Sequence, residues 1–523
     1  MQETKHTLKT KLLKGFVFLR KDTIEHPSKW LAVFLVFTVV LWSLQSAFLK
    51  NILSLDTVES VCWGAQMQLG YYKHPPLAAW IAYVASLLTF HSDWILYFLN
   101  HACLAVGAWY VYLLAGCFFD KRRAAASALL LYFLHYYNPS PAVFCPNPIQ
   151  VCLQPVMAYC FYMAIRDGRW KHWLLLGLFS GLAFLGKYSA GLLLMAMFIG
   201  MCFHKNARKR FFEAGPWGAF AVFCIVVSPH IVWLVQHDFI CLKYVDGSVG
   251  DTPPWFFLPL AIVTALYPIL LQTGVMLFTK LDYLPLITKK QLPCSRPAGF
   301  CILQHYKRSF RFCPDREALY WSAFFTGLPA LLLVLIPVFG GNVVMTWFST
   351  MASWTGMFVL ALLPCYLTKD MFRKLYFLAI VVTLFIFAGT SLDLLIRTRP
   401  RIHLEPELLT ERADMFWKTR TGGKEIPCVF GDRWLANTLE HYLPYHPVSI
   451  ANKDTVHLAR AKQDGTLSNG VLVISDDVEE VIQSFDILAP DKHCQVEHFV
   501  IPVKAPWGKS RFYDIFLMYL PPE

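Results

Sequence analysis

The sequence predicts a polytopic α-helical membrane protein that ends in a small α/β domain. Of its 523 residues, 56% are apolar and only 16% are charged, whereas soluble domains contain about 25% charged residues. The apolar residues form runs long enough to cross a bilayer, which requires about 20 residues for each helix. From Arg397 onward there is no such run, and charged residues are frequent. We therefore expect a transmembrane part followed by a domain outside the membrane.

Eleven apolar runs are candidate membrane spans. They lie at about 30–49, 94–118, 124–141, 149–165, 173–186, 188–203, 215–235, 255–279, 318–340, 346–367 and 373–394. A further apolar stretch, 75–91, fits either another span or a helix that lies in the membrane interface. The first run follows a basic segment and is too long for the apolar region of a typical signal peptide. We expect it to be a retained first helix.

The distribution of Lys and Arg indicates whether 75–91 crosses the membrane. If it does not, most basic residues outside the C-terminal part fall on one side, in the N-terminal tail and the loops at 121–123, 166–171, 205–210, 280–317 and 369–374. The short loops of the other side then hold only Lys50, Lys73, Lys187 and Lys243. Cytoplasmic loops are enriched in Lys and Arg. This rule predicts eleven spans plus one interfacial helix, with the N-terminus in the cytoplasm.

The net charge of +12 raises the question of nucleic-acid binding, because basic patches bind phosphate backbones. The positive charge is concentrated in the loops of one side of the membrane. This distribution indicates that the charge sets the orientation of the protein in the membrane and does not form a nucleic-acid-binding surface. We therefore expect membrane lipids, and no nucleic acid, among the partners.

The C-terminal part contains short apolar segments separated by turns. "IPCVFGD" and "VLVIS" have the pattern of buried strands, and "RWLANTLEHYL" has the pattern of a helix. Roughly 120 residues are enough for a separate core. We divide the chain into a cytoplasmic basic tail (1–29), a transmembrane domain (30–394) with an outer loop at 50–93, and a soluble α/β domain (395–523).

Polar residues other than the basic clusters gather on the predicted outer side. Asp56 and Glu59 follow the first span, and Lys73 and His74 precede the interfacial stretch. The remaining polar segments of this side are "NPSPAVFCPNPIQ" (138–150), the turn Gly186-Lys187-Tyr188, and Pro229-His230 with Gln236-His237-Asp238. Five separate segments thus bring acids, lysines and histidines to one membrane face.

This combination of residues suits group transfer from a lipid phosphate. Asp56 and Glu59 are three residues apart and share one face of a helix. A carboxylate at the membrane surface can accept a proton from an acceptor hydroxyl or amine. Lysines, with a histidine, can bind a phosphate and stabilise it as the leaving group.

Each of these residues also has a structural explanation when it is considered alone. The two acids fit a solvated helix end, and Lys187 fits a side chain that extends to the interface. His230 fits a packed histidine at a helix end, and Asn147 fits a turn or cap. Their gathering on one face is what favours the functional interpretation.

The block after the first span resembles a known family. Asp56-x-x-Glu59, Trp63-Gly64 and Gly70-Tyr71-x-Lys73-His74-Pro75-Pro76-Leu77-x-x-Trp80 resemble the first outer loop of the GT-C-type integral-membrane glycosyltransferases. The branch is that of the dolichyl-phosphate-mannose protein mannosyltransferases and the bacterial aminoarabinose transferases. Further similar segments are "FCPNPIQVCLQPVMAY", "GLFSGLAFLGKYSAGLLL", "SPHIVWLVQHDF" and "MFWKTRTGGKEIPCVFGDRWLANTLEHYLPYHPVS".

The resemblance implies a transferase with a GT-C fold and interfacial helices in the first outer loop. It implies a polyprenyl-phosphate-linked sugar as the donor, and a lipid A, another glycan, a lipid or a protein of the cell envelope as the acceptor. It also implies the periplasmic face of a bacterial inner membrane as the location. The resemblance implies that Asp56 is the catalytic base and that Glu59 is its partner acid. It implies that Lys73 and Lys187 bind the donor phosphate, with His74 and His230 as weaker candidates. The implied residues for binding the acceptor or the sugar are Tyr72, Asn147 and Tyr188.

One position departs from the family pattern. Many relatives have an aspartate in the second loop, in a Thr-Pro-Asp context, where this chain has Cys145-Pro146-Asn147. Because asparagine can neither carry a charge nor act as a base, a paired-carboxylate mechanism across the two loops is in doubt. A divalent metal prefers several anionic oxygen ligands, so we expect no obligatory metal and no other cofactor.

Two other classes of protein fit part of the pattern. A transporter or flippase of lipid-linked sugars would also be polytopic, but transporters usually show internal repeats and ionisable residues near the middle of the membrane. A non-enzymatic subunit of an envelope assembly would not need the combination of acids and lysines.

Overall fold

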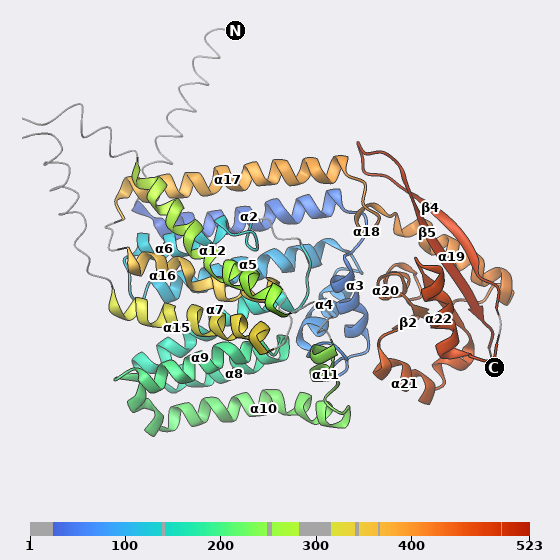
Figure 1. The fold of residues 1–523 in the computed structure, drawn as a ribbon, viewed down its shortest axis with the longest axis horizontal. Coiled ribbons are helices and arrows are strands. Elements are labelled where there is room, and N and C mark those ends of the chain that lie inside the picture. Colours follow the sequence, from blue (N-terminus) through green and yellow to red (C-terminus); the bar gives the residue numbers. More distant parts are fainter. Residues whose placement is uncertain are drawn as a thin grey trace, which may run out of the picture.

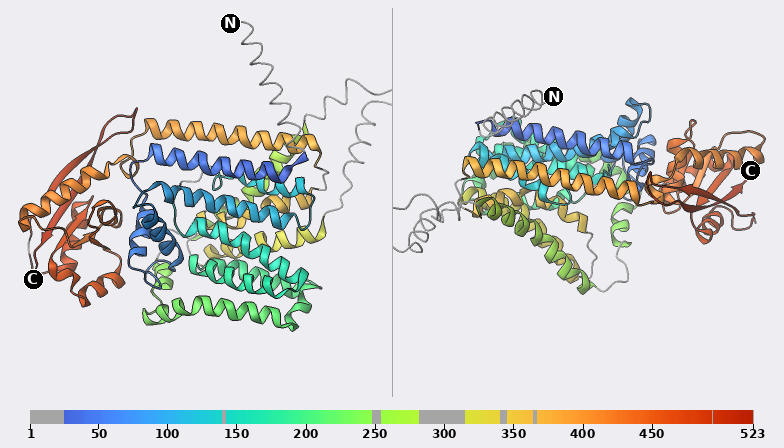
Figure 2. Two further views of the ribbon diagram at one scale, coloured as in Figure 1. Left: turned by 180° about the vertical axis from the view of Figure 1, so that it is seen from behind. Right: turned by 90° about the horizontal axis from the view of Figure 1, so that it is seen from above.

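A computed structural model describes residues 25–138, 142–247, 254–281, 315–339, 345–363, 367–492 and 494–522. Most of the predicted basic tail and of the basic 280–317 loop lies outside these residues. Long helices run side by side in a bundle, and a unit of strands and helices lies at one end of it (Figure 1). The same two parts are seen from behind and from above in Figure 2.

Seven helices among the described residues are long and apolar enough to cross a membrane. They correspond to seven of the eleven expected spans, and they confirm a polytopic helical membrane protein. These helices are α2 (Pro27–Leu49), α5 (Trp94–Ala115), α7 (Pro146–Asp167), α10 (Ala214–Gln236), α12 (Pro254–Leu281), α15 (Arg316–Leu335) and α17 (Lys369–Ile396).

The other four expected spans form shorter or broken helices in the same bundle. They are α6 (Lys121–Leu129) with η1 (Leu130–Phe133), α8 (Trp170–Gly186), α9 (Ala190–Phe203), and η4 (Met345–Ser349) with η5 (Met351–Trp354) and α16 (Thr355–Leu362). Helix α8 packs against α7 and α10. A Cβ atom on Gly177 of α8 would lie 2.3 Å from the carbonyl oxygen of Ala219 in α10, so this close approach requires glycine.

The ambiguous stretch 75–91 forms helix α4 (Leu77–Leu88), which has 12 residues. At 1.5 Å per residue it extends for about 18 Å, less than the roughly 30 Å of the hydrocarbon core. Helix α3 (Leu55–Ala65) lies against α4, because a Cβ atom on Gly64 would be 2.2 Å from the carbonyl oxygen of Ala79. The structure therefore agrees with an interfacial helix and not with another span.

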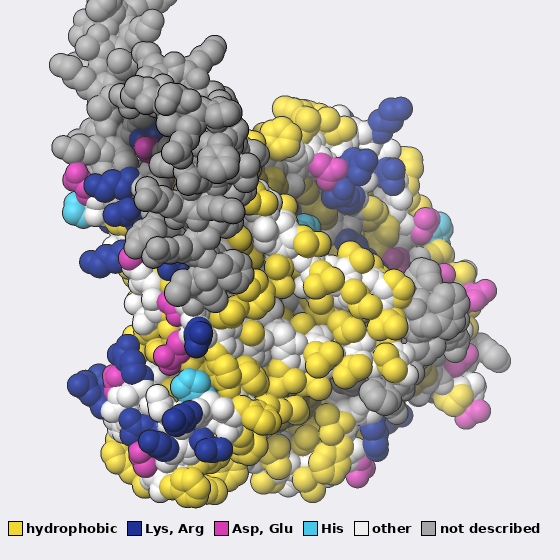
Figure 3. Space-filling view, turned by 60° about the vertical axis from the view of Figure 1, so that its left-hand side comes forward, with side chains coloured by type: hydrophobic (Ala, Val, Ile, Leu, Met, Phe, Trp, Pro, Cys, Tyr) yellow, Lys and Arg dark blue, Asp and Glu magenta, His cyan; other side chains and the backbone are white. Residues whose placement is uncertain are grey.

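The two ends of the bundle differ in character. The turn between α7 and α8, the segment with η2 (Ala207–Phe212) before α10, and the start of α6 lie at one end (Figure 1). This end carries the exposed residues Lys121, Lys171, Lys205, Arg208 and Lys209. Figure 3 shows basic side chains gathered at the margin of a broad apolar surface. Helices α3, α4 and α11 (Ile240–Gly247) lie at the opposite end, beside the C-terminal unit (Figure 1).

The C-terminal unit is a five-stranded sheet with helices. Its strands are β1 (Cys428–Gly431), β2 (Val448–Ala451), β3 (Val471–Ser475), β4 (Glu497–Val503) and β5 (Arg511–Leu520), in the order β2-β1-β3-β5-β4. Strand β1 is parallel to β2 and β3, whereas β5 is antiparallel to β3 and β4. The helical elements are α18 (Pro400–His403), α19 (Pro406–Thr421), α20 (Arg433–Tyr442), α21 (Thr455–Gln463), η6 (Thr466–Asn469) and α22 (Val478–Leu488). The predicted strands and the predicted helix are confirmed as β1, β3 and α20.

The C-terminal unit shares an apolar core with the outer loop. Val58 and Val61 of α3 belong to one buried cluster with Leu435 and Leu439 of α20. Trp434 is fully buried, and its indole N–H donates to the carbonyl oxygen of Leu53 at 3.1 Å. The start of α20 is therefore joined to the segment that leads into α3.

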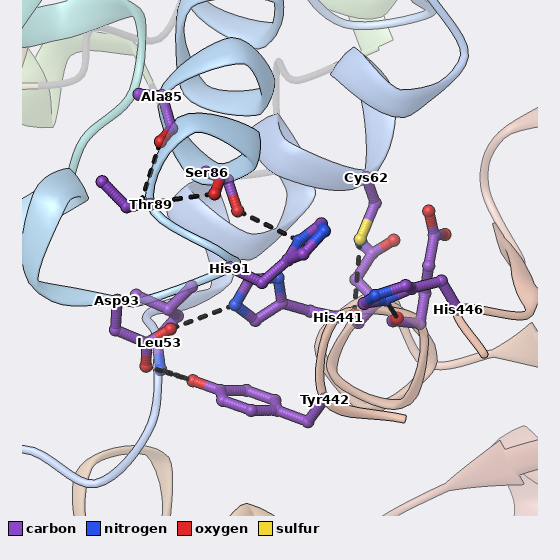
Figure 4. Close-up of polar contacts among 12 residues, drawn as sticks. Leu53, Cys62, Ala85, Ser86, Thr89, His91, Asp93, His441, Tyr442 and His446 are labelled. Carbon is purple, nitrogen blue, oxygen red and sulfur yellow. Dashed lines mark hydrogen bonds and ion pairs between the residues drawn. The ribbon is translucent and has the colours of Figure 1, made fainter. Parts of the chain in front are cut away.

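Polar contacts add a second link between the two parts (Figure 4). The carboxylate of Asp93, just before α5, lies 3.0 Å from Nε2 of His441 and accepts a hydrogen bond from the Tyr442 hydroxyl at 2.5 Å. The backbone N–H of Leu53 donates to the same hydroxyl oxygen at 3.0 Å. One carboxylate thus organises the contact between the end of α20 and the outer loop.

Replacement of Asp93 by alanine should loosen this contact. It leaves His441 and Tyr442 without their acceptor, which costs about 1–3 kcal/mol of folding free energy for buried groups. We expect a lower thermal unfolding temperature of the detergent-solubilised protein and faster proteolysis in segment 397–399. Asp514 is the matched control, since it also pairs with a histidine, His498, at 2.8 Å, but its side chain is 57% exposed. If Asp93→Ala lowered the unfolding temperature no more than Asp514→Ala does, the proposed role of Asp93 in joining the two parts would be wrong.

Candidate functional site

The two predicted acids lie on helix α3. Asp56 is in its first turn, where a negative charge is favoured by the helix dipole, and Glu59 follows one turn later. The Asp56 side chain is 49% exposed, whereas the Glu59 side chain is only 2% exposed. The spacing thus places both acids on one helix, but in different environments.

Two cations contact these acids. The loop between α3 and α4 places Nζ of Lys73 at 3.2 Å from Oδ1 of Asp56 and 3.1 Å from Oε2 of Glu59. Nη1 of Arg433, the first residue of α20, lies 3.5 Å from Oε1 of Glu59. The Tyr72 hydroxyl donates to the same oxygen at 3.3 Å. We refer to Asp56, Glu59, Tyr72, Lys73 and Arg433 as the acid–base cluster.

The cluster balances two carboxylates with two cations. Burial raises the pKa of Glu59, against the opposing effect of Lys73 and Arg433. Burial disfavours the charged form of Lys73. The attraction of the Glu59 and Asp56 carboxylates is larger than this effect of burial, so the pKa of Lys73 is raised. Lys73 therefore stays positively charged at neutral pH.

Aromatic residues of the same block support the loop that carries Lys73. The rings of Trp63 and Tyr71 are stacked with centroids 5.1 Å apart, and the Tyr71 hydroxyl donates to the Trp63 carbonyl oxygen at 2.6 Å. A Cβ atom on Gly70 would lie 2.3 Å from the Trp233 ring of α10. These residues of the motif therefore shape the loop, and we assign them no chemical role.

Lys187 and Asn147 form a second polar group. Lys187 lies in the turn between α8 and α9, and its ammonium group donates to Oδ1 of Asn147 at 2.7 Å. Asn147 is in the first turn of α7. Burial lowers the pKa of Lys187, and the charges of Asp56 and Lys73 also act on it, so this group and the acid–base cluster interact electrostatically. The predicted residues of the first, second and third outer segments are thus brought together.

The two predicted histidines have different environments. Burial, with the positive charges of Lys187 and Lys73, holds the pKa of His74 well below its usual range, so its ring is neutral at neutral pH. Nδ1 of His230 lies 2.7 Å from the Leu69 carbonyl oxygen and therefore donates to it, and Nε2 lies 2.7 Å from the Tyr188 hydroxyl. Both ring nitrogens of His230 are thus engaged, and one of them holds Tyr188.

Arg433 was not among the site residues predicted from the sequence. It belongs to the segment "GDRWLANTLEHYL", whose pattern indicates a capped helix but no partner for the arginine. Its partner Glu59 is far away in the sequence, and only the docking of the C-terminal unit brings the two together.

A group of carboxylates in the C-terminal unit could hold a metal ion. Ligand atoms of Asp432, Asp476 and Glu480 lie within 4.8 Å of one another. Asp432 already accepts two backbone N–H groups as the cap of α20, and Asp476 and Glu480 accept hydrogen bonds from Tyr513 and Ser475. Protein contacts account for their placement, and we assign no metal to them.

Comparisons with known proteins bear on the fold. Residues 73–233 match the family model described as dolichyl-phosphate-mannose-protein mannosyltransferase. This segment contains Lys73, Asn147, Lys187 and His230, whereas α3 with its two acids precedes it. No curated protein sequence matches the chain.

Several solved structures are similar. ArnT from Cupriavidus metallidurans in the apo state has a TM-score of 0.55 at 13% identity, covering 94% of this chain and 98% of that one. ArnT from the same organism bound to undecaprenyl phosphate has a TM-score of 0.54 at 12% identity, covering 93% and 97%. The archaeal oligosaccharyltransferase AglB from Archaeoglobus fulgidus, in complex with an inhibitory peptide and a dolichol-phosphate, has a TM-score of 0.41 at 12% identity, covering 92% and 74%. The predicted GT-C fold is therefore confirmed by the two ArnT structures, and residues 73–233 are similar to the dolichyl-phosphate-mannose-protein mannosyltransferase family.

Proposed function

We propose that this protein transfers a sugar from a polyprenyl-phosphate carrier to an acceptor of the cell envelope. The observation that carries the proposal is the placement of Asp56, Glu59 and Lys73 in ion-pair contact, electrostatically coupled to Lys187, at one end of the bundle. The fold shared with ArnT, one structure of which contains undecaprenyl phosphate, supports the same donor class.

Asp56 suits the role of general base better than Glu59. It is half exposed, and its ion pair with Lys73 uses Oδ1, so an acceptor can approach the carboxylate. Asp56 accepts the proton of an acceptor hydroxyl or amine while that atom attacks the anomeric carbon. The bond between this carbon and the phosphate oxygen breaks, and its electron pair leaves with the polyprenyl phosphate.

The contacts of the two lysines support different roles. Lys73 is shared between two carboxylates, so its first role is to keep these acids ionised and oriented. The hydrogen-bond partner of Lys187 is the neutral side chain of Asn147, and in the described part of the chain no carboxylate lies within ion-pair distance of it. Lys187 is therefore the better ligand for the donor phosphate, where a fixed cation stabilises the leaving group.

The difference between the two ends of the bundle supports the proposed location. The basic turns lie at the end away from the acid–base cluster, and cytoplasmic loops are enriched in Lys and Arg. The site and the C-terminal unit would then face the periplasm, in the inner membrane of a bacterium, with the N-terminus in the cytoplasm. The acceptor is a lipid A, another glycan, a lipid or a protein, and the sugar is a hexose or a pentose.

Asp56→Asn should abolish transfer, since asparagine cannot accept the proton. General base catalysis contributes about 10²–10⁴-fold, so we expect a rate reduced at least 100-fold with unchanged insertion into membranes. The measurement is transfer from radiolabelled polyprenyl-phosphate sugars by purified protein in proteoliposomes. Asp238→Asn, at an exposed position at the end of α10, is the matched control and should retain activity. A fully active Asp56→Asn variant would contradict the assignment of Asp56 as the general base.

Lys187→Ala should weaken donor use. A hydrogen bond to a charged group contributes about 1.5–3 kcal/mol, which corresponds to roughly a 10- to 100-fold higher apparent KM for the carrier-linked sugar. Lys243→Ala, an exposed lysine of α11, serves as the control and should leave this KM unchanged. An unaltered KM in Lys187→Ala would show that this lysine only extends to the interface.

A further inference from the structure

Arg433 is the one member of the acid–base cluster that comes from the C-terminal unit. Its guanidinium group faces Oε1 of Glu59 at 3.5 Å, while Lys73 faces Oε2 at 3.1 Å. Each oxygen of this buried carboxylate therefore has a cation of its own.

The charges explain why the second cation matters. Without Arg433 the cluster would contain two carboxylates and the single ammonium group of Lys73. A buried carboxylate that lacks a partner takes up a proton or draws in the nearest cation. For Glu59 the nearest remaining cation is Lys73, which also pairs with Asp56. Loss of Arg433 would therefore disturb the proposed base through Lys73.

The position of Arg433 is fixed by its neighbours. Oδ1 of Asp432 accepts the N–H groups of Trp434 and Leu435 and so caps α20. The Trp434 indole donates to the Leu53 carbonyl, two residues before α3. The start of α20 and the start of α3 are thus held together, and the guanidinium group is delivered to Glu59 by a rigid element.

We propose that Arg433 is a positioning residue for sugar transfer. By pairing with Glu59 it leaves Lys73 shared between the two acids, and this arrangement keeps Asp56 oriented as the base. The inference rests on the proposed function. It also implies that the C-terminal unit is required to complete the site, in addition to any contact that it makes with an acceptor.

Charged and titratable groups face the cluster from every element packed around it. They are Asp56 and Cys62 on α3, Tyr72 and Lys73 on the following loop, Cys145 before α7, Lys187 before α9, Tyr244 on α11, Arg433 on α20 and Asp454 before α21. Arg433 and Lys73 act to lower the pKa of Glu59. Removal of the arginine should therefore raise this pKa further.

The test compares Arg433→Gln, Arg433→Lys, Glu59→Gln and the double variant Arg433→Gln/Glu59→Gln with the wild type. Transfer from a polyprenyl-phosphate sugar is measured as kcat/KM between pH 5 and 9. We expect the acidic limb of the profile to move by about one unit to higher pH in Arg433→Gln, with partial rescue in Arg433→Lys. In the Glu59→Gln background, Arg433→Gln should change the remaining rate less than about 2-fold. Arg420→Gln is the control, since Arg420 pairs with Glu497 elsewhere in the same unit, and it should leave the profile unmoved.

Thermal unfolding provides a second readout that does not need activity. In Arg433→Gln, ionisation of the buried Glu59 costs more free energy in the folded state than it does in the wild type. The variant should therefore unfold at a lower temperature than the wild type, and this difference in unfolding temperature should grow from pH 5 to pH 8 as Glu59 ionises. The difference should disappear in the Glu59→Gln background. The inference would be overturned if the difference in unfolding temperature did not depend on pH and persisted in the Glu59→Gln background, and if the pH profile of kcat/KM did not shift. A wild type that transfers no sugar at any pH would contradict the proposed function, while the unfolding data would still decide whether Arg433 holds Glu59.

Discussion

The carboxylate of Glu59 lies where water has almost no access, and a charge in such a place must be surrounded by cations and hydrogen-bond donors. Much of the architecture near the site serves this requirement. The loop before α4 must fold back over α3 to bring Lys73 and Tyr72 to the carboxylate, and the stack of Trp63 on Tyr71 holds that loop. The C-terminal unit must dock to bring Arg433. A local electrostatic requirement thus links α3 and the loop that follows it to Arg433 of the C-terminal unit, which is distant in sequence.

The site has two compartments with different chemistry. The acid–base cluster is internally neutral, and its half-exposed acid is available to an acceptor. Lys187, held by Asn147, provides a positive charge in the turn between α8 and α9. The asparagine that replaces the expected aspartate of the second loop therefore has a structural explanation, since its amide oxygen orients a lysine without neutralising it. An aspartate there would pair with Lys187 and reduce its attraction for a phosphate.

Much of the fold could be predicted from the sequence, because long apolar runs and alternating basic loops are direct signals. The seven long helices and the short helix α4 follow from these patterns, and strands β1 and β3 follow from short apolar segments between turns. The expected spans at 173–186 and 188–203 form the continuous helices α8 and α9. The expected spans at 124–141 and 346–367 are instead divided into several shorter helical elements, because apolar composition does not show where a buried helix breaks. Asp56, Glu59 and Lys73 were identified from their spacing and family resemblance. Arg433, Asp93 and the hydrogen bonds of His230 could not be, since they depend on contacts between distant segments.

In the proposed function, the site breaks the bond between a sugar and a polyprenyl phosphate. The most direct measurement follows the label and the carrier together, with purified wild-type protein in liposomes that contain a radiolabelled polyprenyl-phosphate sugar and an envelope lipid extract. We expect labelled acceptor and free polyprenyl phosphate to appear in equal amounts. Label that crosses the bilayer on an intact carrier, or carrier that remains fully glycosylated, would contradict it.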